Sequence, residues 1–120
     1  MNTQSLGAWG EAQAARYLEA HGLEVVGTHY RQKWGELDLI CRDGAAWVFV
    51  EVKTRTMRYE PSALDAITPR KRMRIARAAM SYMKWKRLEG RPMRFDLVLI
   101  EAGEIEWIQD AFELPASYTC

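Results

Sequence analysis

Two segments joined by a tight-turn signal constrain this chain more than any other feature. They read Gly35-Glu36-Leu37-Asp38-Leu39-Ile40 and Phe49-Val50-Glu51-Val52-Lys53-Thr54-Arg55, and Asp43-Gly44 lies between them. Asp-Gly is a strong signal for a two-residue hairpin loop, and such a loop places Asp38 on the same side as Glu51. Side chains alternate along a strand, so Lys53 shares that face with Glu51. The pattern therefore predicts a β-hairpin on which two carboxylates and an amine converge.

An acid pair beside a lysine is suited to chemistry on phosphodiesters. Two adjacent carboxylates repel each other, so one tends to hold a proton unless a cation binds. Mg²⁺ or Mn²⁺ binds such oxygen ligands, polarises a phosphate and makes a bound water more acidic. Asp38 and Glu51 are therefore candidate metal ligands. Lys53 is a candidate catalytic residue that orients or deprotonates water or stabilises transition-state charge.

The Glu-x-Lys spacing alone does not define such a site, because any solvated strand face can carry an ion pair with that spacing. Three further features favour the metal site: Asp38 upstream on the same face, Glu11 beside the apolar stripe of a predicted helix, and a basic helix beyond. A carboxylate at the position of Glu11 needs a partner. Glu11 and Asp96 each stay open to a second interpretation, as structural acids paired with Arg94 or Lys71.

The formal net charge of +1 conceals a strong segregation of charge along the sequence. Residues 1–52 carry 4 basic and 7 acidic side chains, residues 53–94 carry 13 and 3, and residues 95–120 carry 0 and 6. A basic block between acidic flanks is typical of a protein that contacts a polyanion, and this block directly follows the acid pair. We therefore expect nucleic-acid contact, with a solvated helix rich in lysine and arginine as the alternative.

Periodicity and turn residues predict one domain over residues 1–120, because this length suits a single core. The order helix, three strands, helix, two strands favours a mixed α/β sheet of about five strands with helices against it. The predicted helices are Thr3–His21, stopped by Gly22, and a second that begins at Thr68-Pro69 and continues to about Glu89. A loop is expected over residues 56–67, and the strands outside the hairpin are Glu24–Arg31, Phe95–Ile100 and Glu104–Gln109.

Each predicted helix carries an apolar stripe that we expect to pack in the core. The two stripes are Ala8, Ala12, Ala15 and Leu18 in the first helix, and Met73, Ala76, Met80 and Met83 in the second. A second stripe supplies candidate phosphate contacts, which are Arg70, Lys71, Arg74 and Arg77. Arg55 and Arg58, in a basic segment with Tyr59, complete the predicted nucleic-acid contacts. Trp34 and Trp85 could stack on bases, but tryptophan in a small domain more often fills or borders a core.

The remaining reactive residues give little direct information. Cys41 and Cys120 match neither a zinc spacing nor a disulfide framework, so both are expected as reduced thiols. His21 and His29 are poor metal candidates, since His21 sits at a predicted helix end and His29 has no patterned partner. No apolar run is long enough to cross a bilayer and residues 1–6 do not resemble a signal sequence, so a cytoplasmic location without membrane contact is expected.

The two hairpin motifs resemble those of the YraN-like family of small bacterial proteins. This largely uncharacterised family is placed in the PD-(D/E)XK nuclease superfamily and is similar to archaeal Holliday-junction resolvases. The resemblance covers nearly the whole chain, because it extends to Gly10-Glu11, Ala15, Tyr17-Leu18, Lys71 and Arg94-Phe95-Asp96. The sequence departs from the superfamily pattern at Leu37, which stands where the name of the superfamily has proline.

The resemblance implies a restriction-endonuclease-like fold and a role for each matched residue. Asp38 and Glu51 would be the metal ligands, and Lys53 the catalytic lysine. Glu11 would be an additional acid from the helix that helps to position metal or water, and Lys71 a residue that contacts phosphate or supports the metal ligands.

Two functions of different classes follow from these observations. The first is a Mg²⁺- or Mn²⁺-dependent endonuclease that acts on DNA, including branched or other non-standard structures. DNA is favoured as the partner, but the sequence does not decide between DNA and RNA. The second is a nucleic-acid-binding or partner-docking module that keeps the nuclease fold without turnover. The sequence leaves open whether the protein forms a homodimer or needs a protein partner.

Overall fold

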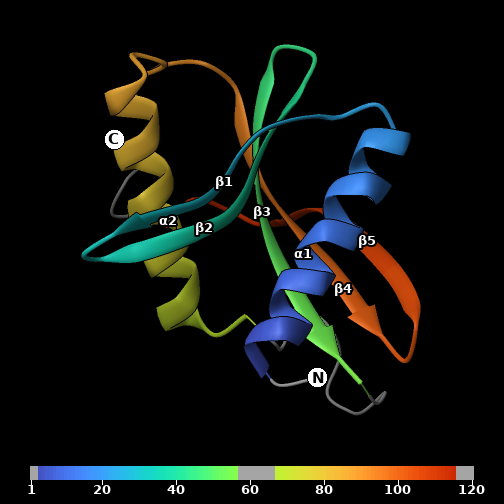
Figure 1. The fold of residues 1–120 in the computed structure, drawn as a ribbon. Coiled ribbons are helices and arrows are strands. Elements are labelled where there is room, and N and C mark those ends of the chain that lie inside the picture. Colours follow the sequence, from blue (N-terminus) through green and yellow to red (C-terminus); the bar gives the residue numbers. More distant parts are fainter. Residues whose placement is uncertain (1–2, 57–66, 116–120) are drawn as a thin grey trace.

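A computed structural model of the protein describes residues 3–56 and 67–115, and it confirms the predicted order of helices and strands (Figure 1). The elements, in chain order, are α1 (Thr3–Ala20), β1 (Glu24–Gln32), β2 (Gly35–Asp43), β3 (Ala46–Arg55), α2 (Pro69–Trp85), β4 (Met93–Glu101) and β5 (Glu104–Phe112). The segment after Thr56, where a loop was predicted, and Arg58, Tyr59 and Cys120 lie outside the described residues.

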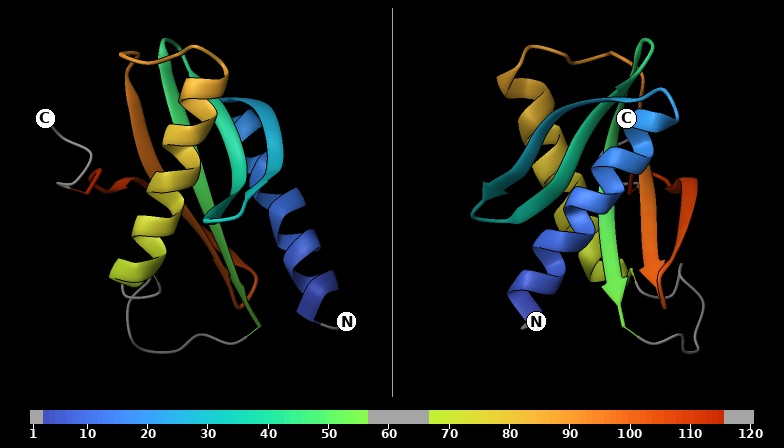
Figure 2. Two further views of the ribbon diagram at one scale, coloured as in Figure 1. Left: turned by 90° about the vertical axis from the view of Figure 1, so that its left-hand side faces the viewer. Right: turned by 45° about the vertical axis from the view of Figure 1, so that its right-hand side comes forward.

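The five strands form one mixed sheet in the order β1-β2-β3-β4-β5. Only β3 and β4 run parallel, because α2 carries the chain back between them, and the other neighbouring pairs are antiparallel. The two helices cover opposite faces of the sheet (Figures 1 and 2). Two separate hydrophobic clusters result, one under each helix.

The central strands are buried on both faces, as a parallel pair covered by helices requires. Alternate residues of β3 divide between the two clusters: Phe49 packs under α2, whereas Val48 and Val50 pack under α1. All six residues of the predicted strand Phe95–Ile100 are buried, which confirms that prediction. In β5, Ile105 and Trp107 are half-buried between exposed glutamates, as their alternation indicated.

The hairpin of β2 and β3 has the predicted loop length, but the loop lies one residue later. Asp43 pairs with Ala46, so Gly44 and Ala45 form the loop, with Gly44 at φ +62°. The loop keeps its length, so the move by one position does not change which side chains share a face of the hairpin. Asp38 and Glu51 therefore lie on the same side, as predicted. The paired residues of β2 and β3 run from this loop to Leu39 opposite Val50.

Both helices end in a Schellman motif, in which the backbone turns left-handed. After α1, Gly22 lies at φ +95° and the Leu23 N–H donates to the Leu18 carbonyl, as expected. After α2, Arg87 takes the left-handed position at φ +58° and the Leu88 N–H donates to the Met83 carbonyl. The predicted end near Glu89 was therefore several residues too late, because arginine gives no sequence signal for this conformation.

The start of α2 agrees with the prediction: the Thr68 hydroxyl accepts a hydrogen bond from the Lys71 N–H, with Pro69 in the first turn. The apolar stripes agree only in part. Met83 and Ala76 are buried, but Met73 and Met80 are half-exposed at the border of the stripe. Small residues bring α2 close to the sheet, so the central buried positions belong to Ile75, Ala78, Ala79 and Tyr82.

The stripe of α1 is also displaced from the prediction. Ala8 and Ala12 are exposed, whereas Gly10, Ala14 and Leu18 are buried. Gly10 sits so close to β3 that a Cβ atom there would overlap the Thr54 side chain. The helix therefore crosses the sheet at a glycine, which carries no hydrophobic signal. Neither helix of the described chain has an apolar run long enough to cross a lipid bilayer.

Candidate active site

The candidate site begins where β2 separates from β3. The last backbone pair of the two strands is Leu39 with Val50. Beyond it, a backbone N–H of β3 donates to a side chain of β2 and not to its backbone. The Val52 N–H donates to Asp38 Oδ2 at 2.8 Å. Asp38 thus replaces the missing strand partner, since a backbone N–H next to a buried core needs an acceptor. This bond holds the carboxyl group of Asp38 against β3.

Asp38 and Glu51 line the same pocket and each shifts the pKa of the other, so the predicted convergence of these two groups is observed. The Glu51 side chain is only 8% exposed. Burial, and then the nearby charge of Asp38, raise the pKa of Glu51 to about 7. Burial also raises the pKa of Asp38, although the hydrogen bond from Val52 opposes this shift. The pair therefore holds a proton close to neutral pH in the absence of a cation.

Lys71 of α2 contacts the acid pair directly. Its Nζ lies 2.6 Å from Glu51 Oε1 and remains 41% exposed. This ion pair lowers the pKa of Glu51 but does not overcome the effects of burial and of Asp38. Lys71 was predicted as a phosphate contact or a residue supporting the metal ligands, and the structure places it at the acid pair itself.

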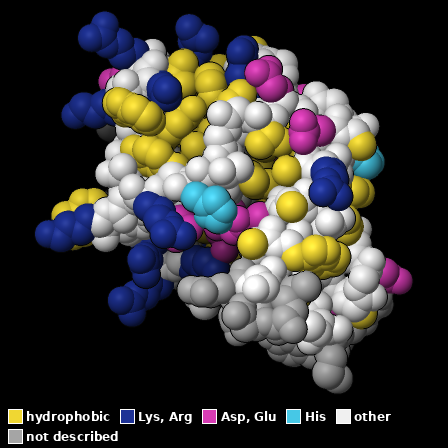
Figure 3. All heavy atoms as spheres, in the orientation of Figure 1, with side chains coloured by type: hydrophobic (Ala, Val, Ile, Leu, Met, Phe, Trp, Pro, Cys, Tyr) yellow, Lys and Arg dark blue, Asp and Glu magenta, His cyan; other side chains and the backbone are white. Residues whose placement is uncertain are grey.

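A pocket of about 580 Å³ opens over the acid pair between α2 and the start of β2. Carboxylates lie on one side and basic groups of the helix lie on the other. Its lining consists of Glu36, Asp38, Glu51, Thr68, Arg70, Lys71, Arg74 and Ile75. Figure 3 shows the same arrangement on the surface: Asp and Glu side chains gather beside a histidine, and Lys and Arg side chains extend on the side where α2 lies.

Glu11 reaches this region from the opposite helix. Its Oε2 lies 2.6 Å from His29 Nε2, and Nδ1 of the same ring lies 3.7 Å from Glu36 Oε1. Burial, and then the charge of Asp38, raise the pKa of Glu11. The side chain that lies next to Glu11 is therefore His29, and not Arg94 or Lys71, although within the described chain Glu11 Oε2 accepts no hydrogen bond.

Lys53 and Arg55 follow Glu51 on β3 but are placed differently from it. Lys53 is half-buried beside Leu99, and within the described chain no hydrogen bond or ion pair joins it to Asp38 or Glu51. The Arg55 side chain is 9% exposed, and its Nη1 donates to Glu101 Oε2 at 3.1 Å. Arg55 thus offers little surface to a polyanion, because its guanidinium is engaged with an acid on β4.

The helix arginines are the predicted nucleic-acid contacts that the structure exposes most clearly. Arg70, Arg74 and Arg77 all point away from the core. Arg70 and Arg74 line the pocket over the acid pair, and all three line a neighbouring groove. The stripe of basic residues predicted on this helix therefore borders the acid pair.

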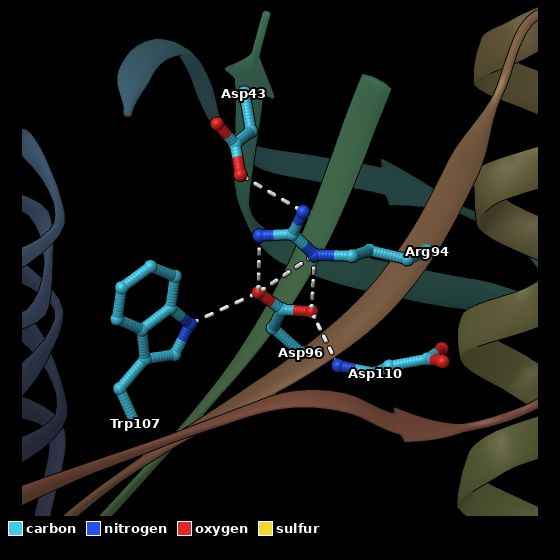
Figure 4. Close-up of polar contacts among 5 residues, drawn as sticks. All are labelled: Asp43, Arg94, Asp96, Trp107 and Asp110. Carbon is cyan, nitrogen blue, oxygen red and sulfur yellow. Dashed lines mark hydrogen bonds and ion pairs between the residues drawn. The ribbon is translucent and has the colours of Figure 1, made fainter. Parts of the chain in front are cut away.

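Asp96 belongs to a separate, structural network (Figure 4). It is completely buried, and its two oxygens accept hydrogen bonds from the Arg94 guanidinium, from Trp107 Nε1 at 2.9 Å and from the Asp110 N–H at 2.9 Å. Arg94 also donates to Asp43 Oδ2 at 2.9 Å. Of the alternatives left open for Asp96, the pairing with Arg94 is the one observed.

The donor set suits a small hard cation that keeps part of its hydration. Among the described residues, no three His, Cys, Asp or Glu side chains group as a complete protein cage for a metal. Magnesium is commonly held by one or two carboxylates together with water and substrate phosphate. Asp38 and Glu51, whose pKa values are both raised, match that requirement, because a cation would favour the charged form of both carboxyl groups. Asp38 and Glu51 would therefore hold the ion.

Two residues that lie next to the site, His29 and Glu36, were not identified from the sequence. His29 was thought to lack a partner, yet the register of β1 and β2 places it between the pairs Thr28–Leu39 and Tyr30–Leu37, opposite Asp38. The short turn after Gln32, which pairs with Gly35, was the available signal for this register. Glu36 belongs to the first motif, but no pattern distinguished it from an exposed strand residue.

The mixed five-stranded sheet, its two helices and the acid pair at the separating strands define an α/β protein with a restriction-endonuclease-like fold. A model of the uncharacterised protein family UPF0102 matches residues 10–100. The chain therefore belongs to the UPF0102 family, and the resemblance to the YraN-like group is confirmed.

Several UPF0102 proteins of similar length are similar to this chain in sequence. A UPF0102 protein from Shewanella baltica is 44% identical over 108 residues, which cover 90% of this chain and 99% of the relative. UPF0102 proteins from Syntrophus aciditrophicus and Ralstonia pickettii are each 43% identical, over 118 and 119 residues. These alignments cover 93% of this chain and of the Syntrophus relative, and 95% of this chain and 94% of the Ralstonia relative.

Proposed function

We propose that this protein is an endonuclease that hydrolyses phosphodiester bonds in DNA, including branched or other non-standard structures, with Mg²⁺ or Mn²⁺. The observation that carries the proposal is the convergence of Asp38 and the buried Glu51 at the base of a pocket with a basic wall. A bound ion would polarise the scissile phosphate and acidify a water.

The chain's own residues have distinct roles in this proposal. Asp38 and Glu51 hold the ion, and the hydrogen bond from Val52 fixes the orientation of Asp38. Lys71 pairs with Glu51 in the free protein, and its exposed ammonium can turn to a phosphate when a cation takes that role. Arg70 and Arg74 retain the nucleic-acid backbone beside the acids. Lys53 orients the attacking water or stabilises charge in the transition state.

A second candidate is a nucleic-acid-binding or partner-docking module without turnover. The observation that favours it is the ion pair at 2.6 Å between Lys71 and Glu51, which satisfies Glu51 without a metal. The position of Lys53, outside the lining of the pocket, points the same way. Removal of the Lys53 amine separates the two candidates, because it would abolish cutting by a nuclease but leave binding by such a module almost unchanged.

The decisive experiment measures nicking of linear, circular, single-stranded and four-way DNA with Mg²⁺ or Mn²⁺. In Asp38→Ala, Glu51→Ala and Lys53→Ala we expect the rate to fall by about a hundredfold or more, because each change removes a metal ligand or a proton-transfer group. Glu106→Ala, which removes an exposed acid on β5, is the matched control and should cut like the wild type.

Metal binding is tested independently of activity. Titration calorimetry with Mn²⁺ should detect binding to the wild type and to Lys53→Ala, but not to Asp38→Ala, while circular dichroism confirms that each variant is folded. Wild-type protein that binds no metal and cuts none of the four substrates would exclude the enzyme and leave the binding module.

A further inference from the structure

Trp34 is an exposed aromatic residue at the edge of the candidate active site. It lies in the turn between β1 and β2, and 59% of it is accessible to solvent. Within the described chain its ring stacks on no other ring, and Lys33 Nζ lies over the ring, 4.9 Å from the centroid. The sequence interpretation that such a tryptophan fills or borders the core therefore does not apply to Trp34.

A groove of about 370 Å³ extends from this tryptophan along α2. Its described lining contains no acid and consists of Lys33, Trp34, Arg70, Met73, Arg74 and Arg77. Arg70 and Arg74 also line the pocket over Asp38 and Glu51, so the groove and the acid pair adjoin each other across the same two arginines. Phosphates of a bound strand along these arginines would lead to the carboxylates.

The turn that carries Trp34 is held firmly against the helix. Gly35 is buried and lies so close to α2 that a Cβ atom there would overlap the Arg74 carbonyl. Farther along β1, the Tyr30 hydroxyl hydrogen-bonds Ser81 of α2 at 3.0 Å. Figures 1 and 2 show the β1–β2 hairpin crossing α2, with its tip beside the helix. Trp34 is thus presented next to the arginines before any ligand arrives, which lowers the entropic cost of binding.

Trp85 provides an internal comparison on the same helix. It is 64% exposed, but one face of its ring stacks on Tyr30 and its edge meets Tyr82, with centroids 5.9 and 6.0 Å away. This tryptophan therefore has a packing role, and it does not line the basic groove. Of the two, only Trp34 lines the groove that Arg70, Arg74 and Arg77 form.

We propose that Trp34 stacks on an unpaired base of a nucleic-acid strand whose phosphates lie along Arg70, Arg74 and Arg77. The inference rests on the proposed function and specifies its substrate as a strand with a single-stranded segment beside the cut. Bases in a duplex already stack on their neighbours, so only an unpaired base can present its face to the ring. DNA and RNA share this chemistry, and the experiment distinguishes them.

The experiment measures equilibrium binding by fluorescence anisotropy in EDTA, so that cutting plays no part. The probes are a labelled thymidine oligonucleotide, the same strand with abasic sites in place of its bases, the matching duplex and a uridine oligonucleotide. Trp34→Ala should weaken binding of the thymidine strand about tenfold, as expected for the loss of base stacking. Its effect on the abasic strand and on the duplex should stay within about twofold, since phosphate contacts are unchanged.

Two variants control the result, after circular dichroism has shown each to be folded. Trp34→Phe keeps a stacking face and should recover most of the affinity, and Trp85→Ala should bind like the wild type. The inference is wrong if Trp34→Ala has no effect, if it weakens the abasic strand equally, or if wild-type protein binds no oligonucleotide. A protein that shows the predicted pattern but cuts no substrate with metal would retain this site and lose only the nuclease proposal. A larger Trp34→Ala effect on uridine than on thymidine would assign the site to RNA.

Discussion

At the scale of residues, the acids of the candidate site lower the stability of the folded protein. Glu51 is buried beside the half-buried Asp38, and the charge of Asp38 disfavours the charged form of Glu51, an effect that Lys71 offsets only in part. Buried acids without a full complement of counter-charge commonly mark sites where a ligand supplies the missing charge. The acid pair therefore destabilises the fold at neutral pH in the absence of a cation.

Glu51 should make metal-free protein less stable as the pH rises. Its pKa is about 7 when folded and near 4.5 as a free side chain, so between these pH values only the folded state keeps the proton. Stability then falls from about pH 4.5 to about pH 7, by roughly 3 kcal/mol in total, and stays lower above that. Urea unfolding in EDTA at several pH values would measure the change.

Glu51→Gln provides the comparison, because glutamine can hydrogen-bond but does not titrate. The variant should lose less stability over the same pH range and should be more stable than the wild type at pH 8. Equal losses in both proteins would show that other groups, and not Glu51, cause the dependence.

At the scale of elements, close approach of backbones at glycines positions the helices. Gly10 allows α1 to lie against Thr54 of β3, and Gly35 allows the β1–β2 turn to lie against Arg74 of α2. Neither contact leaves space for a methyl group. These two contacts set how far each helix stands from the sheet, and so where Glu11 and Arg74 lie relative to Asp38.

Two glycines of α1 should respond oppositely to alanine. Gly7→Ala should stabilise the protein by up to about 1 kcal/mol, because no atom lies within 4 Å of the new methyl group and alanine favours helix. Gly10→Ala should destabilise it by about 1–3 kcal/mol, since the methyl group would overlap Thr54 and force α1 from the sheet. Thermal unfolding of both variants measures the difference.

Thr54→Ala in the Gly10→Ala background should recover part of the lost stability, because it removes the hydroxyl nearest the new methyl group. A Gly10→Ala variant as stable as Gly7→Ala would show that the helix can shift without cost, and the close packing would then have no role in placing Glu11.

For the whole molecule, the charge separation seen along the sequence becomes a separation in space. The basic side chains of α2 gather beside the pocket, on the same side as the tip of the β1–β2 hairpin (Figure 3). Several other basic residues serve the fold instead, as Arg94 does by binding Asp96 and Asp43. The surface available to a polyanion is thus smaller than the number of basic residues in the segment 53–94 indicated.

The salt dependence of nucleic-acid binding should reveal which basic residues contact phosphate. In a plot of log affinity against log salt concentration, Arg77→Ala should reduce the slope by about 1, because one fewer counterion is released. Arg91→Ala, an exposed arginine after α2 that lines neither the pocket nor the groove, should keep the wild-type slope. Equal slopes for both variants and the wild type would place the phosphates elsewhere.

Local sequence patterns were sufficient to predict much of the fold and the acid pair at the centre of the site. The loop length of the β2–β3 hairpin and the alternation of side chains predicted that Asp38 and Glu51 converge. The Thr68-Pro69 signal located the start of α2, and Gly22 located the end of α1. Each of these features depends on neighbours in the sequence, and that is why composition and spacing can reveal it.

The sequence by itself determined the order of the elements, the acid pair and a basic helix beyond it, because short-range geometry fixes which side chains share a strand or a helix face. Only the tertiary structure decided that His29 lies next to Glu11, that Arg55 pairs with Glu101 and that Trp34 lines a groove with Arg74. These outcomes depend on the distance between elements remote in the chain. Close packing at glycines sets that distance, and a glycine shows nothing in a hydrophobic pattern.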